Sequence, residues 1–207
     1  MDKSILILGV GNILWADEGF GVRCVEQLAG RYAFADNVTL MDGGTQGVNL
    51  MGPISSHSHV LLFDAVDFKE EPTTLIQVND ADIPSFFSKN KMSLHQMGVS
   101  EILAALNLLG QYPKAMSLIG IQPQLLEDFG GSLTNEIKTQ IPKAIEMGLE
   151  QLTSWGVSYK ELAGDEVVEP LLFAGVRQQD FEEGRPSSHK AYRKGDVRFL
   201  NDFYGKG

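Results

Sequence analysis

The 207-residue sequence contains a single cysteine, Cys24, so no disulfide bond can form within the chain. A chain without disulfides fits a reducing compartment, and we expect the protein to be cytoplasmic. Cys24 lies among Val22, Val25 and Leu28, an apolar setting that favours a small buried thiol over a reactive one. We therefore assign it no catalytic role.

Long hydrophobic runs are also missing from the sequence. No apolar stretch approaches the roughly 20 residues that cross a bilayer, and residues 1–10 lack the basic start of a signal peptide. We expect no membrane insertion. Hydrophobic residues still make up 43% of the chain, which is enough for a globular domain with a real core.

Basic residues are scarce relative to acidic ones. The chain has 17 Lys and Arg residues against 27 Asp and Glu residues, and its net charge of -10 argues against nucleic acid as a partner. The imbalance lies in residues 1–159, with 9 basic against 18 acidic residues, whereas residues 160–207 have 8 against 9. The nearly neutral end of the chain suggests a part with a separate role.

Apolar runs and amphipathic segments alternate along the chain up to residue 157. We predict strands at residues 4–10, 38–41, 59–63, 74–78 and 116–121, and helices at about 19–32, 46–56, 94–109 and 133–155. Near-continuous apolar strands are typical of a parallel sheet covered on both faces, so residues 1–157 predict an α/β sandwich. Residues 158–207 predict an extension, partly disordered or packed on this body.

A glycine-rich turn follows the first predicted strand and resembles the start of a dinucleotide-binding motif. Gly9 and Gly11 have the expected spacing, but Leu14 stands where the third glycine belongs. The acid that ends the next strand, Asp42, comes 31 residues after Gly11 instead of about 20. A nucleotide-binding α/β protein is therefore a weak alternative.

Three dispersed residues, Glu18, Asp64 and His95, form the stronger pattern. Glu18 follows the first strand, Asp64 ends the third, and His95 opens a helix. If these strands are neighbours, the two carboxylates and one imidazole make a metal site with open positions. No HExxH motif, Cys/His cluster or Gly-x-Ser-x-Gly elbow competes with it. The spacing alone favours turn acids and a histidine beside a helix cap, and both interpretations stay open.

Five motifs in order give the chain its resemblance to a known family. They are residues 9–23 (GVGNILWADEGFGVR), 42–47 (DGGTQG), 64–67 (DAVD), 91–96 (KMSLHQ) and 120–123 (GIQP). With these motifs the chain resembles the hydrogenase maturation endopeptidases that process [NiFe]-hydrogenase large subunits. It looks most like the branch that serves membrane-bound uptake hydrogenases. The resemblance spans residues 4 to about 157.

The resemblance implies a three-layer α/β/α fold. Its five-stranded, mixed, mainly parallel sheet has the order 2-1-3-5-4, counted along the chain, with strand 4 antiparallel. It also implies that Glu18, Asp64 and His95 are the metal-binding positions, and no departure from the family pattern occurs at any of them. Asp42 is expected to line the same cleft, because its strand flanks the first one.

The family removes a C-terminal peptide from the large-subunit precursor after nickel insertion. We therefore expect nickel supplied by the substrate precursor, no tightly bound metal of the chain's own, and a monomer whose partner is that precursor. The family is sometimes grouped with aspartic peptidases, although no Asp-Thr-Gly pair is present. A carboxylate serves as general base in this interpretation. The alternative of another class is a non-catalytic, nickel-sensing chaperone of the large subunit.

Overall fold

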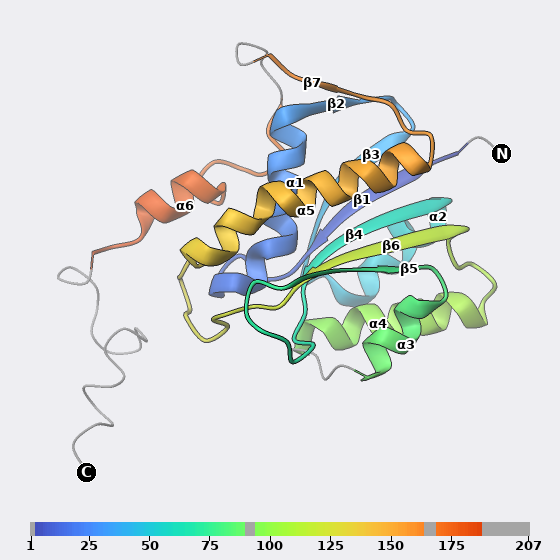
Figure 1. The fold of residues 1–207 in the computed structure, drawn as a ribbon, viewed down its shortest axis with the longest axis horizontal. Coiled ribbons are helices and arrows are strands. Elements are labelled where there is room, and N and C mark those ends of the chain that lie inside the picture. The colour runs from blue at the N-terminus through green and yellow to red at the C-terminus, as the bar shows by residue number, and fades with distance from the viewer. Residues whose placement is uncertain (1–2, 90–93, 164–168, 188–207) are drawn as a thin grey trace.

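The computed structural model describes residues 3–89, 94–163 and 169–187, with residues 94–98 described by their backbone alone. Its centre is a five-stranded sheet in the order β3-β1-β4-β6-β5 (Figure 1). The strands are β1 (Ile5–Val10), β3 (Val38–Gly44), β4 (His59–Ala65), β5 (Leu75–Asn79) and β6 (Ala115–Ile121). Only β5 runs antiparallel to its neighbour. Counted as the five predicted strands, this is the expected order 2-1-3-5-4, which is confirmed.

Helices cover both faces of the sheet and complete the three expected layers (Figure 1). One face carries α1 (Phe20–Arg31) and α5 (Asn135–Ser154). The other carries α2 (Met51–Ser56), α3 (Asp82–Lys89) and α4 (Leu94–Leu108). The predicted helix at 46–56 is divided, because a 3-10 turn η2 (Gly47–Leu50) precedes α2.

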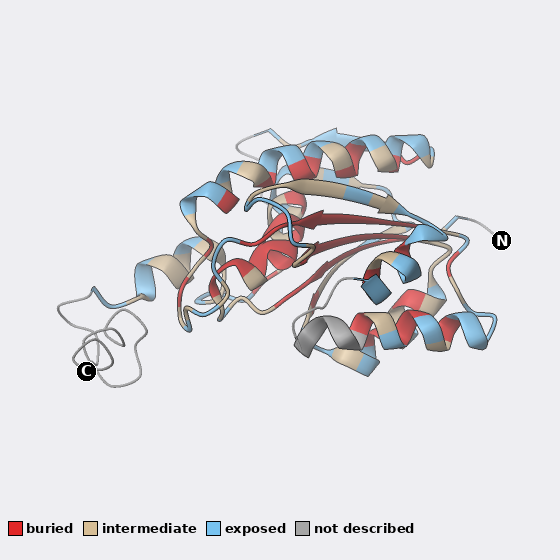
Figure 2. Ribbon diagram, turned by 60° about the horizontal axis from the view of Figure 1, so that its bottom comes forward, coloured by how far each residue is buried: buried red, intermediate tan, exposed pale blue. Residues whose placement is uncertain are grey.

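The alternation of side chains along β1 explains why this strand is apolar throughout. Ile5 and Ile7 pack with α1 and α5, whereas Leu6 and Leu8 pack with the helices of the opposite face. All four are fully buried, and Figure 2 shows the parallel strands as the buried centre of the molecule. A strand covered on both faces has no solvent side to make polar.

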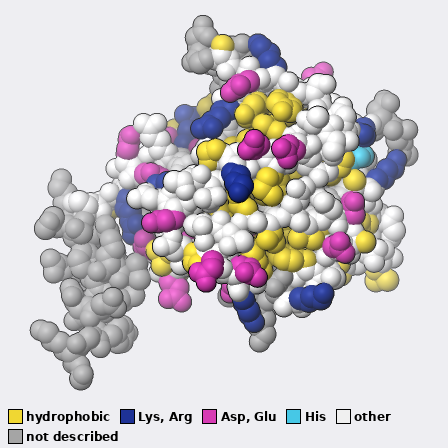
Figure 3. Space-filling model, in the orientation of Figure 1, with side chains coloured by type: hydrophobic (Ala, Val, Ile, Leu, Met, Phe, Trp, Pro, Cys, Tyr) yellow, Lys and Arg dark blue, Asp and Glu magenta, His cyan; other side chains and the backbone are white. Residues whose placement is uncertain are grey.

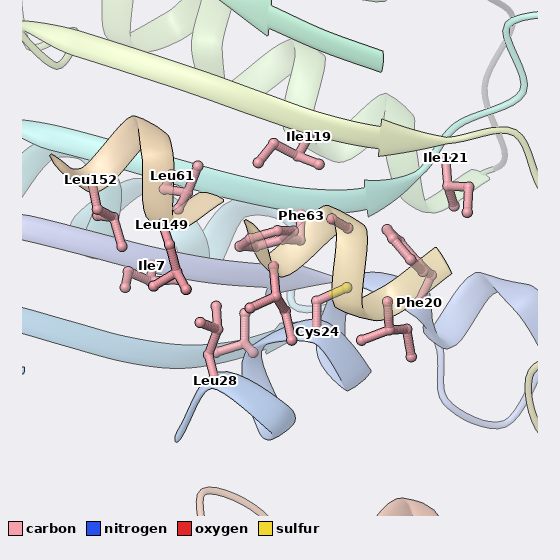
Figure 4. Packing of buried hydrophobic residues seen from close by; sticks show 14 of the residues in the cluster. Ile7, Phe20, Cys24, Leu28, Leu61, Phe63, Ile119, Ile121, Leu149 and Leu152 are labelled. Atoms are coloured by element: carbon pink, nitrogen blue, oxygen red, sulfur yellow. The ribbon is translucent and has the colours of Figure 1, made fainter. Parts of the chain in front are cut away.

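Cys24 lies in the layer between α1 and the sheet, close to Phe63 and Phe20 (Figure 4). It is fully buried, as expected, and burial raises the pKa of its thiol well above its ordinary value. A buried, protonated thiol is a poor nucleophile.

Two further pieces of structure lie outside the main sheet. A short antiparallel ribbon joins β2 (Tyr32–Phe34) to β7 (Tyr159–Glu161), and a helix α6 (Gln178–Gly184) follows. In Figures 1 and 2, α6 lies on the side where the parallel strands end. Leu172, just before it, is buried. The described part of the predicted extension thus packs on the body, and the boundary at residue 157 stays a prediction.

Acidic side chains outnumber basic ones in the sequence, and many of them are exposed on the surface. Figure 3 shows Asp and Glu side chains scattered over the face that α5 covers. Among the described residues, no helix combines the length and the apolar character that a membrane crossing requires.

Candidate functional site

The candidate site lies where the parallel strands end. The loops that follow β1, β3, β4 and β6 meet at this edge because the four strands point the same way. In open α/β sheets, this edge is the usual place for a ligand. The loop after β1 contains a 3-10 turn, η1 (Ala16–Gly19), which leads directly into α1.

The glycines of the first motif allow α1 and η1 to approach the sheet closely. A Cβ atom on Gly21 would lie 2.1 Å from the Phe63 carbonyl oxygen and 2.3 Å from that of Val10. Gly11 has a φ of 130°, and its Cβ atom would lie 1.8 Å from the Glu18 carbonyl oxygen. These glycines are thus explained by backbone packing, without a bound phosphate.

Asp17, the first acid of η1, is fully buried and holds the edge together. Its carboxylate accepts hydrogen bonds from the backbone N–H groups of Gln124 (3.0 Å), Leu125 (2.8 Å) and Thr134 (2.7 Å). The Thr134 hydroxyl adds a fourth at 3.2 Å. Asp17 therefore ties η1 to the loop after β6 and to the start of α5.

Glu18 and Asp64 lie at the same edge of the sheet. Glu18 is partly exposed on η1, and η1 packs against β4, the strand that carries Asp64. Asp64 is 2% exposed. It alternates with Phe63 and Ala65, which face α1 and α5, so its side chain belongs to the opposite face. The strand neighbourhood expected for these two carboxylates is present.

His95 lies in the first turn of α4, the helix that covers the face to which Asp64 belongs. Because α4 leads through residues 109–114 into β6, its first turn is at the end of the sheet where β6 finishes. The side chain of His95 falls outside the described residues. Among the side chains that are described, no group of three His, Cys, Asp or Glu residues could hold a metal ion.

Asp42 is on β3, on the other side of β1 from Asp64. It is paired in register with Gly9, and its Oδ1 accepts a hydrogen bond from the Gly44 N–H at 2.8 Å. Burial raises the pKa of this carboxyl, and the nearby Arg23 guanidinium only partly opposes the effect. Asp42 lines a pocket of about 260 Å³ with Gly11, Asn12 and residues of neighbouring loops.

Gln122, inside the fifth motif, supports the loop after β4. Its Nε2 donates to Asp67 at 3.1 Å, and its Oε1 accepts from the backbone N–H of Phe68 at 2.9 Å. Gln122 therefore fastens the loop after β4, which begins next to Asp64, to the end of β6. The sequence contained a signal for Gln122, since it was a polar residue next to an apolar strand, but it gave no partner.

Arg23 is a second residue to which the sequence assigned no role. It is 1% exposed on the side of α1 that residues 171–185 cover, where its Nη1 donates to Glu26 at 2.8 Å and to the Val176 carbonyl oxygen at 2.7 Å. An arginine among Phe20, Val22 and Cys24 was the available signal.

A larger hollow of about 860 Å³ lies between α5 and the β2–β7 ribbon. Its lining includes Arg31, Tyr32, Lys143 and Tyr159, and none of the four predicted site residues. We therefore place the candidate site at the carboxyl edge of the sheet, where the carboxylates gather.

Comparisons with known proteins identify the family of the chain. Residues 22–151 match the family model of HycI, described as hydrogenase maturation protease. The chain is 48% identical over 197 residues to the hydrogenase expression/formation protein HoxM of Azotobacter vinelandii, covering 95% of this chain and 94% of the relative. It is 42% identical to the hydrogenase 2 maturation protease of Escherichia coli, covering 74% and 93%.

The fold has a solved counterpart in the hydrogenase maturating endopeptidase HybD from E. coli. That structure aligns with a TM-score of 0.73 and 39% identity, over 77% of this chain and 98% of its own length. The family model ends at residue 151, so β7 and α6 lie outside it. The resemblance seen in the motifs is confirmed, and the chain belongs to the hydrogenase maturation protease family, a family of peptidases.

Proposed function

We propose that this peptidase removes the C-terminal peptide from the nickel-loaded precursor of a [NiFe]-hydrogenase large subunit. In this proposal the nickel arrives with the substrate, and Glu18, Asp64 and His95 complete its coordination. The observation that carries the proposal is the common edge shared by η1 and the end of β4, where two of the three residues lie.

The donor set fits a metal that is read and released. Two carboxylates and one imidazole, with no thiolate, are too few to hold a nickel ion firmly, but they can add to ligands already on a precursor. Such a metal polarises a peptide carbonyl or activates a water molecule. A carboxylate at the same edge then accepts the proton.

The surface around the carboxyl edge of the sheet is suited to binding a protein substrate. Four large apolar side chains stand exposed on the loops there, at 40% for Leu14, 71% for Val48, 40% for Leu125 and 57% for Phe129. The Phe129 ring packs against Trp15, with 5.3 Å between the ring centres, and the next residue, Gly130, donates its N–H to the Leu14 carbonyl oxygen at 2.8 Å. Exposed apolar groups gathered around one site are typical of a surface that contacts another protein.

The decisive experiment incubates the purified chain with nickel-loaded and nickel-free precursor and measures truncation by mass spectrometry. We expect a C-terminal peptide to be released from the nickel-loaded form alone. Efficient cleavage of the nickel-free form contradicts the role of nickel. Binding of the loaded precursor without any truncation means that the chain acts as a chaperone.

The three site residues are tested by neutral replacements. Glu18→Gln, Asp64→Asn and His95→Ala should each abolish processing and leave the thermal unfolding midpoint nearly unchanged. Glu146→Gln removes an equal charge from the exposed side of α5 and serves as the control. Normal processing by any of the first three variants removes that residue from the site.

The proposal includes three properties of the free protein. The purified chain should carry little metal by elemental analysis, should be a monomer by light scattering, and should act in the cytoplasm. Stoichiometric zinc that resists a chelator would indicate an ordinary metallohydrolase instead.

A further inference from the structure

Residues 171–185 pack against α1 and against the loop after β6. The Val176 carbonyl oxygen accepts from Arg23, and the backbone N–H of Gln178 donates to Glu26 Oε1 at 3.0 Å. At the other end of α6, Arg185 forms a two-point ion pair with Asp128, with distances of 2.8 and 2.6 Å. The segment is thus anchored at both ends to parts of the body that border the candidate site.

Arg23 is the central anchor. Its side chain is 2% exposed, its guanidinium lies 5.8 Å from the centre of the Phe181 ring, and it is hydrogen-bonded to both Glu26 and Val176. A second nitrogen, Nη2, is buried and finds no hydrogen-bond partner within the part of the chain that the structure describes. Burying a guanidinium is costly. Because Arg23 contacts both Val176 and Phe181, we infer that it holds residues 171–185 against α1.

The anchored segment forms part of the pocket that contains Asp42. Val176 contributes one wall, the loop from Gly11 to Leu14 contributes another, and Asp42 and Thr45 complete the polar side. The pocket also shares Gly11 with the turn that carries Glu18, since the Gly11 backbone packs on the Glu18 carbonyl. A group bound in the pocket would therefore lie next to the turn that carries Glu18.

The size and the lining of the pocket fit one amino-acid side chain. Its volume of about 260 Å³ is below the roughly 300–1,000 Å³ of small-molecule sites. Ile13, Leu14, Val22 and Val176 supply apolar walls, and Asp42 is the one acid among the described residues of the lining. The best match is a side chain with an aliphatic stem that ends in a hydrogen-bond donor or a cation.

We propose that this pocket receives one side chain of the precursor near its cleavage site, that Val176 sets the size of the pocket, and that Arg23 positions Val176. This inference depends on the proposed function, because the occupant belongs to the precursor. It gives the segment of residues 171–185 a part in substrate selection.

The first test fills the pocket. Val176→Trp should raise the KM for nickel-loaded precursor at least 10-fold and change kcat less than twofold, because a lost subsite removes binding shared by ground state and transition state. Val176→Ile should have an intermediate effect. The matched control is Phe173→Trp, since Phe173 is 88% exposed on the same segment and does not line the pocket. A KM for Val176→Trp equal to that of the control overturns the proposal.

The second test identifies the occupant. Each precursor residue near the cleavage site is replaced by alanine, and every replacement is measured with wild type and with Val176→Trp. One replacement should raise the KM of wild type about 10-fold and have no further effect on Val176→Trp, since the two changes remove the same contact. Additive effects at every position overturn the proposal.

Arg23 is tested as a positioning residue by Arg23→Met and by the conservative Arg23→Lys. Arg23→Met should raise KM as Val176→Trp does, and Arg23→Lys should restore part of the loss. If Arg23→Met fails to fold, the Val176 variants decide alone.

Calorimetric measurement of binding to the loaded precursor distinguishes failure of the pocket from failure of the proposed peptidase function. If wild type binds the loaded precursor more tightly than Val176→Trp but does not cleave it, the peptidase role is refuted and the pocket is supported. If wild type and Val176→Trp bind the loaded precursor equally well, the pocket is refuted.

Discussion

Thr134 donates two hydrogen bonds to Asp17, one from its backbone N–H at 2.7 Å and one from its hydroxyl at 3.2 Å. Thr134 occupies the N-cap position of α5, yet its hydroxyl makes no bond to that helix. The threonine therefore links the first turn of α5 to the loop after β1 instead of capping its own helix.

Replacing Asp17 with alanine should destabilise the protein by about 3 kcal/mol, because three partly buried backbone N–H groups and a hydroxyl lose their acceptor, a fully buried carboxylate. Urea unfolding followed by circular dichroism measures the loss. Glu18→Gln, one residue along, is the control and should stay within about 0.5 kcal/mol of wild type. A loss below 1 kcal/mol for Asp17→Ala contradicts the structural role.

Gly21 and Gly30 are both in α1 but should respond to alanine in opposite ways. At Gly21 the new methyl group would lie 2.1 Å from a backbone oxygen of β4, whereas at Gly30 nothing lies within 4 Å. Gly21→Ala should cost more than about 3 kcal/mol, and Gly30→Ala should add up to about 1 kcal/mol of stability. Thermal unfolding midpoints of the two variants test the pair, and a well-folded Gly21→Ala would show that the contact is not tight.

Asp42→Asn should stabilise the protein at neutral pH more than at acidic pH. Burial raises the pKa of Asp42 above its ordinary value of 3.8, with Gly44 N–H and Arg23 opposing the shift and Glu26 adding to it. Folding thus favours the protonated form, so the ionised carboxylate costs stability above pH 3.8 and not below it. The gain from Asp42→Asn, measured by urea unfolding, should shrink from pH 7 to pH 4. A gain that is constant across this range contradicts the expectation.

The ion pair between Arg185 and Asp128 should contribute about 1 kcal/mol, more than a typical surface pair, because both oxygens of the carboxylate are used and both side chains are partly buried. A double-mutant cycle with Arg185→Gln and Asp128→Asn measures this coupling. The pair Gln179 and Glu183, on the exposed side of α6, provides the control cycle and should show almost none.

The sheet was predictable because its strands are short apolar runs between turn residues, and their order came from the family resemblance. The β2–β7 ribbon was not, since each strand has three residues and pairs across more than 120 positions. Tyr32 was assigned to the preceding helix, and no alternation marks residues 159–161 as a strand. Such pairings depend on tertiary contacts, here between the aromatic rings of Tyr32, Phe34 and Tyr159.

The site shows the same division. The sequence predicted that Glu18 and Asp64 lie at one edge of the sheet, because Glu18 follows one apolar strand and Asp64 ends another. It gave no role to the neighbouring Asp17, since the hydrogen-bond partners of Asp17 lie more than 100 residues away. The role of Val176 was equally hidden, because it depends on where residues 171–185 pack and not on their own pattern.

The burial of Cys24 has a practical consequence for experiments on this protein. Its thiol cannot meet a labelling reagent unless the layer between α1, α5 and the sheet opens. A cysteine introduced at exposed Phe173 would then be the only thiol that reacts in the native state. A fluorophore attached there would report directly on substrate binding beside the pocket, with the native cysteine left in place and silent.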